Sequence, residues 1–322
     1  MKKALITGVA GSGGSYLAEH LVDEGLEVHG ISRLHSTTHR KNLKNVEDKV
    51  NLHHVDLCDF GSFFRCLSKL KPDYIFHIAS MANVRDSFEN PITIVNNNIN
   101  ITLNLLEIAR TLKEKENYNP RIQICSTSEV YGEVDPKNIP IKETCPLNPA
   151  SPYAVSKLCQ DKLSQVYYWG YGLDIIRTRM FAYFNARRGD LFSTSFARQI
   201  IDIKRGHRNI LKHGNLNSER VLIDVRDAVG AYWIAMKKCR SGEAYNIGGE
   251  NSISVGKVLD ILIKKSGIEI KREQDPSLLR PKDITLQIPD SSKFKEETGW
   301  FPKYSLSESL DFFLKEVELY YD

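Results

Sequence analysis

The chain has 322 residues, of which 41% are hydrophobic and 26% charged, values typical of a globular protein of one or two domains. Its net charge at pH 7 is +4. Because this small excess is spread along the chain, it argues against a nucleic-acid-binding protein, whose basic residues gather on one face. No stretch approaches the roughly 18 apolar residues of a membrane span. The six cysteines include no C-x-x-C pair, so we expect reduced thiols in a cytoplasmic protein without a metal site.

Short apolar segments alternate with helical patterns through the first half of the chain. Strand–helix alternation of this kind predicts a parallel sheet with helices on both faces, a doubly wound, Rossmann-type α/β fold. We expect strands at 4–6, 27–31, 51–55, 74–78, 122–125 and 174–177, and helices at 15–24, 60–69 and 94–110.

The pattern loosens after about residue 180, where we expect mostly loops, followed by helices at 255–265 and 307–319. This change predicts a boundary between two domains. The first is a Rossmann domain over residues 1–180, with a return segment near 223–250, and the second is a smaller mixed domain over residues 181–322.

A glycine-rich turn joins the first predicted strand to the first helix. Its spacing is G-x-x-G-x-x-G, which allows a tight turn and lets backbone amides approach a pyrophosphate. The helix that follows offers oriented N–H groups and a partial positive charge. Such glycines also occur in ordinary strand–helix turns, but the position directly after the first strand favours dinucleotide binding. The expected contacts are Gly8, Gly11, Ser12, Gly13 and Gly14.

The end of the second strand indicates which dinucleotide is bound. An acidic residue there would bind the ribose 2′-hydroxyl and repel a 2′-phosphate, but the chain has Ser32 and Arg33. A guanidinium beside hydroxyl donors suits a phosphate, so we expect NADP. The alternative is that Arg33 is simply exposed at the start of a loop. Asp56, Leu57 and Ala79 are further expected cofactor contacts, although Asp56 could instead be a helix N-cap.

Residues suited to proton transfer lie in two segments, 126–132 and 151–157. Tyr153 and Lys157 stand at i and i+4, so one helix presents both side chains on the same face. A free phenol has a pKa of about 10, and a neighbouring ammonium and a cationic nicotinamide ring would lower it. We therefore expect Tyr153 to take a proton from a sugar hydroxyl, while Thr127 hydrogen-bonds the same oxygen.

Glu129 separates two classes of reaction. A simple carbonyl reductase needs only a hydroxyl, a tyrosine and a lysine. A carboxylate beside them can act as a general base on the acidic proton next to a newly made ketone. That step permits loss of the neighbouring hydroxyl as water, assisted by Ser128 or by protonated Glu129. The alternative is that Glu129 caps a helix or orders a loop.

These segments resemble the extended short-chain dehydrogenase/reductase family and, within its nucleotide-sugar branch, the GDP-mannose 4,6-dehydratase family. The resemblance implies a redox-neutral cycle with bound NADP. Hydride leaves C4 of the mannose, Glu129 takes the C5 proton, water leaves from C6, and hydride returns to C6 to give GDP-4-keto-6-deoxymannose. The matching segments are 14–19, 27–30, 126–132, 151–155, 187–189, 214–216, 279–281 and 299–302.

The same resemblance implies roles for residues of the second half. Arg188 would contact the cofactor, Asn185 the substrate, and Arg220 and Arg280 the nucleotide diphosphate, the alternative for these two arginines being surface ion pairing. It also implies that the partner molecule is a nucleotide-diphosphate sugar, with a GDP-linked hexose favoured, and that the protein is a homodimer or homotetramer.

The chain departs from this family on the substrate side. Directly before two consecutive arginines, Arg187 and Arg188 in this chain, the family typically reads Phe-Asn-His-Glu-Ser-Pro. Residues 181–186 of this chain read Phe-Ala-Tyr-Phe-Asn-Ala instead. The second half resembles the sister GDP-4-keto-6-deoxymannose reductases about as well, so a reductase or a related C4 oxidoreductase or epimerase is the alternative. A catalytically silent NADP-binding scaffold is a third, disfavoured by the intact Thr127, Tyr153 and Lys157.

Overall fold

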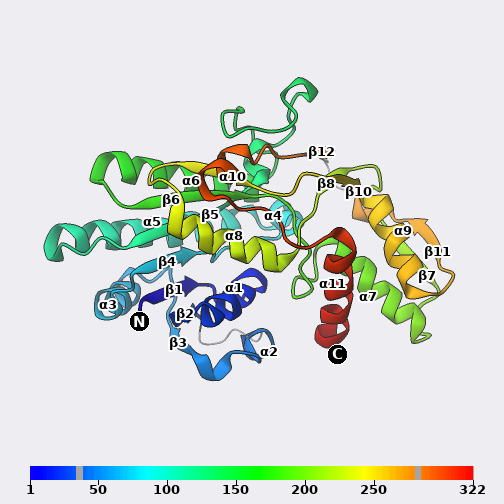
Figure 1. The fold of residues 1–322 in the computed structure, drawn as a ribbon, viewed down its shortest axis with the longest axis horizontal. Coiled ribbons are helices and arrows are strands. Elements are labelled where there is room, and N and C mark those ends of the chain that lie inside the picture. The colour runs from blue at the N-terminus through cyan, green and yellow to red at the C-terminus, as the bar shows by residue number, and fades with distance from the viewer. Residues whose placement is uncertain (34–38, 280–283, 322) are drawn as a thin grey trace.

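The computed structural model describes residues 1–33, 39–279 and 284–321 (Figure 1). A seven-stranded parallel sheet with the strand order β3-β2-β1-β4-β5-β6-β9 forms its centre. This order confirms the Rossmann-type fold predicted from the sequence. The strands are β1 (Lys3–Thr7), β2 (Glu27–Ser32), β3 (Val50–His54), β4 (Tyr74–His77), β5 (Arg121–Thr127), β6 (Ile175–Met180) and β9 (Ala244–Ile247).

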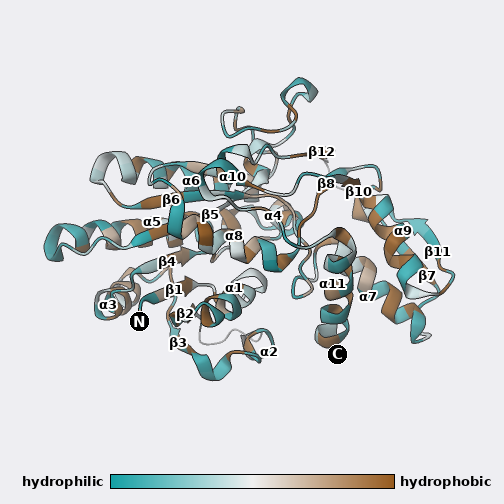
Figure 2. Ribbon diagram, in the orientation of Figure 1, coloured by the Kyte–Doolittle hydropathy of each residue, from teal (hydrophilic) through white to brown (hydrophobic). Residues whose placement is uncertain are grey.

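Helices cover both faces of this sheet. One face carries α1 (Ser12–Asp23), α8 (Val225–Lys238) and α10 (Ser292–Thr298). The hydrophobic core on this face includes Leu17, Ala228 and Phe294, one residue from each helix. The other carries α3 (Phe60–Leu70), α5 (Pro91–Glu116) and α6 (Pro152–Tyr171), with Phe63 and Leu105 in its core. Figure 2 shows hydrophobic residues in the central strands and a hydrophilic far end of α5. The apolar face of each helix therefore packs against the sheet.

Several segments after β6 build a smaller lobe, at the right of Figure 1, whereas α8, β9 and α10 belong with the central sheet. Helices α7 (Phe192–Lys204), α9 (Val255–Ser266) and α11 (Leu306–Tyr321) pack around Phe196, Val258 and Phe313. Two small sheets accompany them, β10-β8-β12 and β11-β7. Their strands are β7 (Ile210–His213), β8 (Glu219–Val221), β10 (Ser252–Ser254), β11 (Lys271–Gln274) and β12 (Leu286–Gln287); the remaining helices are α2 (His39–Leu43) and α4 (Val84–Glu89).

The expectation of mostly loops between residue 180 and α9 was wrong, because α7 and α8 lie in this range. Helix α7 places Phe196, Ile200 and Ile201 on a buried face, but its first turn contains Ser193, Thr194 and Ser195, which disguise the helical pattern. Strand β9 and helix α8 join the central sheet rather than the smaller lobe. The division into two domains at residue 180 stays a prediction.

A buried ion cluster fixes α6 against the sheet. The Asp161 carboxylate on α6 accepts hydrogen bonds at 2.9 Å from Arg177 Nη1 and from Arg179 Nε, both on β6. All three side chains are almost completely buried. Because removal of one partner would leave an uncompensated buried charge, this cluster holds the helix in one position.

A second network of buried polar side chains joins β1, β4, α5 and α6. His77 at the end of β4 contacts Thr7 Oγ1 through Nδ1 at 3.0 Å and Thr102 Oγ1 through Nε2 at 2.9 Å. Gln160 on α6 donates to the same Thr102 hydroxyl at 2.6 Å. Burial lowers the pKa of His77 to about 3, so the imidazole is neutral. The network therefore links β1, β4, α5 and α6 without introducing a charge.

Among the residues described, no helix is both long and apolar enough to cross a membrane.

Candidate active site

A cleft of about 970 Å³ lies at the carboxyl edge of the central sheet and extends to the smaller lobe. Its size suits small-molecule ligands. The strand order reverses between β1 and β4, and ligands of open α/β sheets bind beside such a point. The cleft is lined by the segments that follow β1, β2, β3, β4, β5 and β6 and, from the smaller lobe, by residues such as Phe192, Lys212, Arg220, Val255 and Leu279.

The glycine turn after β1 forms a cradle that side chains would fill. Gly8 has φ +70°, and a Cβ on it would lie 2.9 Å from the Cα of Ala79, at the end of β4. A Cβ on Gly14 would lie 2.4 Å from the Gly8 carbonyl oxygen. Helix α1 begins at Ser12, so its free amides and its partial positive charge are at the cleft. This cradle fits the pyrophosphate of the dinucleotide expected from the sequence.

The end of β2 forms another wall of the cleft. Ser32 Oγ is buried and has no hydrogen-bond partner among the described residues, and the exposed Arg33 follows it. Asp56 and Leu57 also line the cleft. The N-cap of α3 is Asp59, whose carboxylate accepts from Gly61 and Ser62 amides, so Asp56 does not have the alternative N-cap role. Instead, Asp56 accepts a hydrogen bond from the Cys58 amide at 2.9 Å.

Thr127 ends β5 and starts a short 3₁₀ turn that carries Ser128 and Glu129. The Thr127 hydroxyl accepts a hydrogen bond from the Glu129 amide at 3.3 Å, which fixes the direction of the turn. Glu129 is half-buried, and its Oε1 accepts from Gln287 Nε2 on β12 at 3.5 Å. The carboxylate therefore lies where the sheet edge meets the smaller lobe. Nothing in the sequence pattern singled out Gln287.

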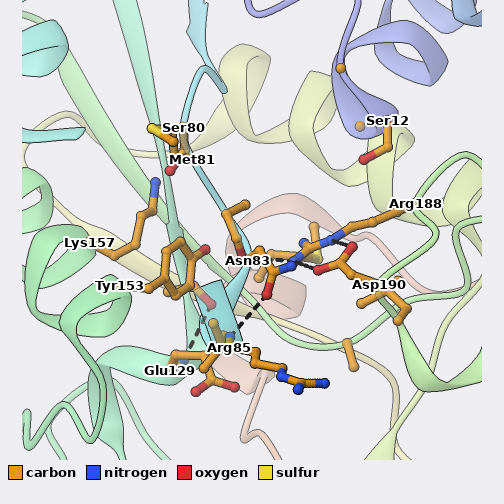
Figure 3. A pocket seen from close by; sticks show the side chains of 18 of the residues that line it. Ser12, Ser80, Met81, Asn83, Arg85, Glu129, Tyr153, Lys157, Arg188 and Asp190 are labelled. Atoms are coloured by element: carbon orange, nitrogen blue, oxygen red, sulfur yellow. Dashed lines mark hydrogen bonds and ion pairs between the residues drawn. The ribbon is translucent and has the colours of Figure 1, made fainter. Parts of the chain in front are cut away.

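Tyr153 and Lys157 project from the first turns of α6 into the same cleft (Figure 3). The helix starts at Pro152, and its N-cap Ser151 accepts from the Ala154 amide at 3.1 Å. Burial raises the pKa of Tyr153 to about 12. Burial lowers the pKa of Lys157 to about 8, and its Nζ donates to the Cys125 carbonyl oxygen.

The Arg188 guanidinium opposes the raised pKa of Tyr153. Lys157 donates from its ammonium to the backbone of β5. Arg188 donates from Nη2 to the Ala82 carbonyl at 2.8 Å and pairs through Nε with Asp190 Oδ1 at 2.9 Å. Asp190, two residues beyond Arg188, was not among the predicted site residues. Figure 3 shows the pair reaching the cleft from the side opposite Lys157.

The structure brings most of the predicted residues together in this cleft, but not all. Asn185 does not line it: the side chain is completely buried and its Oδ1 accepts from the Arg187 amide at 3.1 Å. Direct contact between Asn185 and substrate is therefore not supported, because this amide shapes the loop from within. Arg280 lies outside the described residues. The residues of the cleft that were predicted are Gly8, Gly11, Ser12, Gly13, Gly14, Arg33, Asp56, Leu57, Ala79, Thr127, Ser128, Glu129, Tyr153, Lys157, Arg188 and Arg220.

Arg220 on β8 lines the cleft with its guanidinium partly engaged by backbone. Its Nη2 donates to the Ile284 carbonyl at 2.6 Å, and its Nη1 donates to the Thr285 carbonyl at 3.2 Å. These bonds hold the guanidinium between β8 and the segment leading into β12. Arg220 is thus a positioned cation at the smaller-lobe end of the cleft.

Comparisons with known proteins agree with this architecture. A family model described as GDP-mannose 4,6 dehydratase matches residues 5–311. The GDP-mannose 4,6-dehydratase of Yersinia enterocolitica is 31% identical over 345 residues, which cover 96% of this chain and 91% of that protein. The structure of RMD from Pseudomonas aeruginosa with NADPH is 25% identical, with a TM-score of 0.83 over 99% of both chains. The dTDP-glucose 4,6-dehydratase DesIV from Streptomyces venezuelae, solved with NAD and TYD, is 25% identical with a TM-score of 0.86, covering 98% of this chain and 97% of that chain.

We expect dinucleotide binding to depend on pH, because Lys157, which lines the cleft, has a lowered pKa. Since that pKa is about 8, the ammonium is charged below this pH and loses its charge above it. We expect the affinity for NADP, an anion, to fall by up to about tenfold per pH unit above this value, because binding favours the charged form. Fluorescence titration of the protein with NADP at increasing pH measures this dependence. Lys157→Met should bind NADP more weakly with a flat pH profile, and a flat wild-type profile would contradict the prediction.

Proposed function

Because this chain belongs to the GDP-mannose 4,6-dehydratase family, within the short-chain dehydrogenases/reductases, we propose that it converts GDP-mannose to GDP-4-keto-6-deoxymannose. The observation that carries this proposal is Glu129, a half-buried carboxylate in the same cleft as Thr127 and Tyr153. A carboxylate at this place can serve as the general base that elimination requires and that simple ketone reduction does not. The enzyme is then an NADP-dependent lyase.

The glycine cradle and the end of β2 support NADP as the resident cofactor. When bound, NADP would supply a place for the electron pair of the sugar between its removal and its return, so that the reaction would be redox-neutral overall. Gly8, Gly13 and Gly14 leave room for the diphosphate. Ser32 and Arg33 offer a hydroxyl and a guanidinium where a carboxylate would exclude a 2′-phosphate.

The proposed roles of the remaining groups follow from proton transfer. Tyr153 takes the proton of the C4 hydroxyl, and Thr127 holds that oxygen. Glu129 takes the proton from C5, which the C4 ketone has made acidic. The C6 hydroxyl then leaves as water, with a proton supplied by Ser128 or by the protonated Glu129. The hydride removed from C4 returns to C6 and C5 regains a proton, so that the two protons taken up by Tyr153 and Glu129 are both given back. Arg188 opposes the raised pKa of Tyr153 and so favours the phenolate needed for the first step.

The smaller lobe supports a nucleotide-diphosphate sugar as the substrate. Arg220 and Lys212 place positive charge at its end of the cleft, and Phe192 and Leu279 provide apolar surface for a base. We propose that residues 181–322, apart from the segment that returns to the sheet, form the nucleotide-sugar-binding domain. The proposed base is guanine, as in the named relatives.

Glu129→Gln tests the proposed reaction. We expect its turnover of GDP-mannose to fall by about 100-fold or more, because the amide cannot accept the C5 proton. NADP affinity should stay within about twofold, since the change removes no proposed cofactor contact. Mass spectrometry detects the keto product as a loss of water, and the absorbance of the nicotinamide should show no net change.

Glu133→Gln is the matched control, because Glu133 is exposed and does not line the cleft. Its turnover should equal that of the wild type. Unchanged turnover of Glu129→Gln would remove the carboxylate from the mechanism. Stoichiometric NADPH consumption with a keto-sugar, and no reaction of GDP-mannose, would identify a 4-keto reductase instead.

Arg33→Asp tests the choice of cofactor. We expect the dissociation constant for NADP to rise by about tenfold or more, because a charge-assisted hydrogen bond is lost and a repulsive charge is introduced. The affinity for NAD should rise or stay unchanged. Fluorescence titration with both dinucleotides measures the ratio. The control is Arg65→Asp, an equal charge change at an exposed position of α3; equal effects of both variants on NADP would contradict the prediction.

We also propose that the protein is a homodimer or homotetramer. Helix α6 carries an exposed apolar stripe in which Val155, Val166 and Trp169 are 46%, 53% and 69% exposed. Val166 and Trp169 lie 11 and 14 residues after Val155. Both spacings are close to whole numbers of helical turns, so the three side chains share one face of the helix. Apolar stripes of this kind are typical of protein interfaces, and tryptophan is a frequent anchor.

Trp169→Glu tests this interface. We expect it to lower the molar mass in solution toward that of a monomer, because burying the new carboxylate would be costly. Light scattering coupled to size-exclusion chromatography measures the mass. Leu319→Glu on α11, at a side chain that is 52% exposed, should leave the mass unchanged. A wild-type monomer, or an oligomer that tolerates Trp169→Glu, would contradict the proposal.

A further inference from the structure

Arg187, the first of the two consecutive arginines, is a buried cation that the proposed mechanism does not use. Its neighbour Arg188 lines the cleft, whereas Arg187 does not. The Arg187 side chain has no exposed surface. Because a buried guanidinium is costly unless it is paired and hydrogen-bonded, its partners show which parts of the structure it holds together.

Two carboxylates from different helices compensate the charge of Arg187. Its Nη2 donates to Glu19 Oε1 on α1 at 2.7 Å and lies 3.6 Å from Glu316 Oε2 on α11. Its guanidinium carbon lies 3.7 Å from the ring centroid of Tyr16 on α1 and 4.7 Å from that of Tyr320 on α11. The Tyr16 hydroxyl in turn donates to Glu316 Oε2 at 2.9 Å. Arg187 therefore joins the last helix of the chain to the helix that follows the glycine turn.

The second terminal nitrogen of Arg187 leads to the glycine turn itself. Nη1 donates to the backbone carbonyl of Asn42 on α2 at 3.1 Å. The Asn42 side chain is buried, and its Nδ2 donates to the Ala10 carbonyl at 2.8 Å. Ala10 lies between Gly8 and Gly11 in the turn and lines the cleft. One series of contacts therefore runs from the guanidinium through Asn42 to a carbonyl of the cradle.

We propose that Arg187 is a positioning residue of the cofactor site, which acts through Asn42 to hold the glycine turn in the conformation that binds the dinucleotide. The proposal rests on the proposed NADP cofactor and goes beyond it, because neither Arg187 nor Asn42 lines the cleft. The two consecutive arginines then have different tasks, Arg188 inside the cleft and Arg187 behind its wall. Helix α11, which supplies Glu316 and Tyr320, thereby supports a turn some 300 positions earlier in the chain.

Asn42→Ala tests the contact that bears directly on the turn. We expect the dissociation constant for NADP to rise by about fivefold to tenfold, because a turn that has lost this hydrogen bond adopts the binding conformation less often. Isothermal titration with NADP measures the constant, at a temperature where a thermal melt shows the variant to be folded. The matched control is Asn51→Ala, because Asn51 donates to the Val28 carbonyl at 3.4 Å and does not line the cleft.

Arg187→Lys tests whether the arginine acts through Asn42. The ammonium keeps the positive charge beside the two carboxylates but lacks the planar fork that bonds in two directions at once. We expect the dissociation constant for NADP to rise by about fivefold in the wild-type background and by less than about twofold in Asn42→Ala, where the link is already broken. Arg121→Lys, which alters the ion pair with Asp174 outside the cleft, is the control and should lower the melting temperature without changing NADP affinity.

Wild-type affinity for NADP in folded Asn42→Ala would overturn the inference, as would an equal effect of Arg187→Lys in both backgrounds. A merely structural arginine would lower the melting temperature and leave the dissociation constant unchanged, as expected for Arg121→Lys. Should Arg187→Lys fail to fold, Asn42→Ala still decides, because it leaves the buried ion pairs intact. A wild-type protein that binds neither NADP nor NAD would instead overturn the proposed function, so the two failures are distinguishable.

Discussion

The close approach of two backbone segments at the centre of the sheet determines the site. Strands β1 and β4 are neighbours, and the turn after β1 comes so near the end of β4 that a Cβ on Gly8 would lie 2.9 Å from the Cα of Ala79. This proximity sets the start of α1 at the cleft. It also brings the segment after β4 beside the glycine cradle, where Ala82 accepts a hydrogen bond from Arg188. A larger residue at position 8 would separate these segments and remove the cradle.

Buried charge supplies the second constraint. Asp161 is enclosed by two guanidinium groups from β6, and its helix carries Tyr153 eight residues and Lys157 four residues earlier. A helix held in this way cannot rotate without exposing or unpairing a charge. The neutral His77 network acts in the same direction, since it joins α6 to β1 through α5. The phenol and the ammonium are therefore directed into the cleft by interactions that lie behind them.

The sequence predicted the features that depend on local patterns and missed those that depend on distant contacts. Six of the seven strands of the sheet, the glycine turn and the i, i+4 relation of Tyr153 and Lys157 follow from periodicity and spacing, whereas strand β9 was expected only as part of a return segment. The burial of Asn185 could not be read in this way, because it results from a loop that folds back on Arg187. Likewise, the pairing of Lys157 with the Cys125 carbonyl depends on the packing of α6 against β5, which spacing alone does not reveal.

The hydrogen bond between Glu129 and Gln287 joins residues 158 positions apart in the chain. Glu129 belongs to the edge of the central sheet, whereas Gln287 belongs to β12 and pairs in register with Arg220 on β8. A fragment ending at residue 180 would retain Thr127, Glu129, Tyr153 and Lys157 but would lack the amide that this carboxylate contacts. The two halves of the polypeptide are thus inseparable at the level of a single carboxylate, and shortening the protein to residues 1–180 would leave that carboxylate without its neighbour.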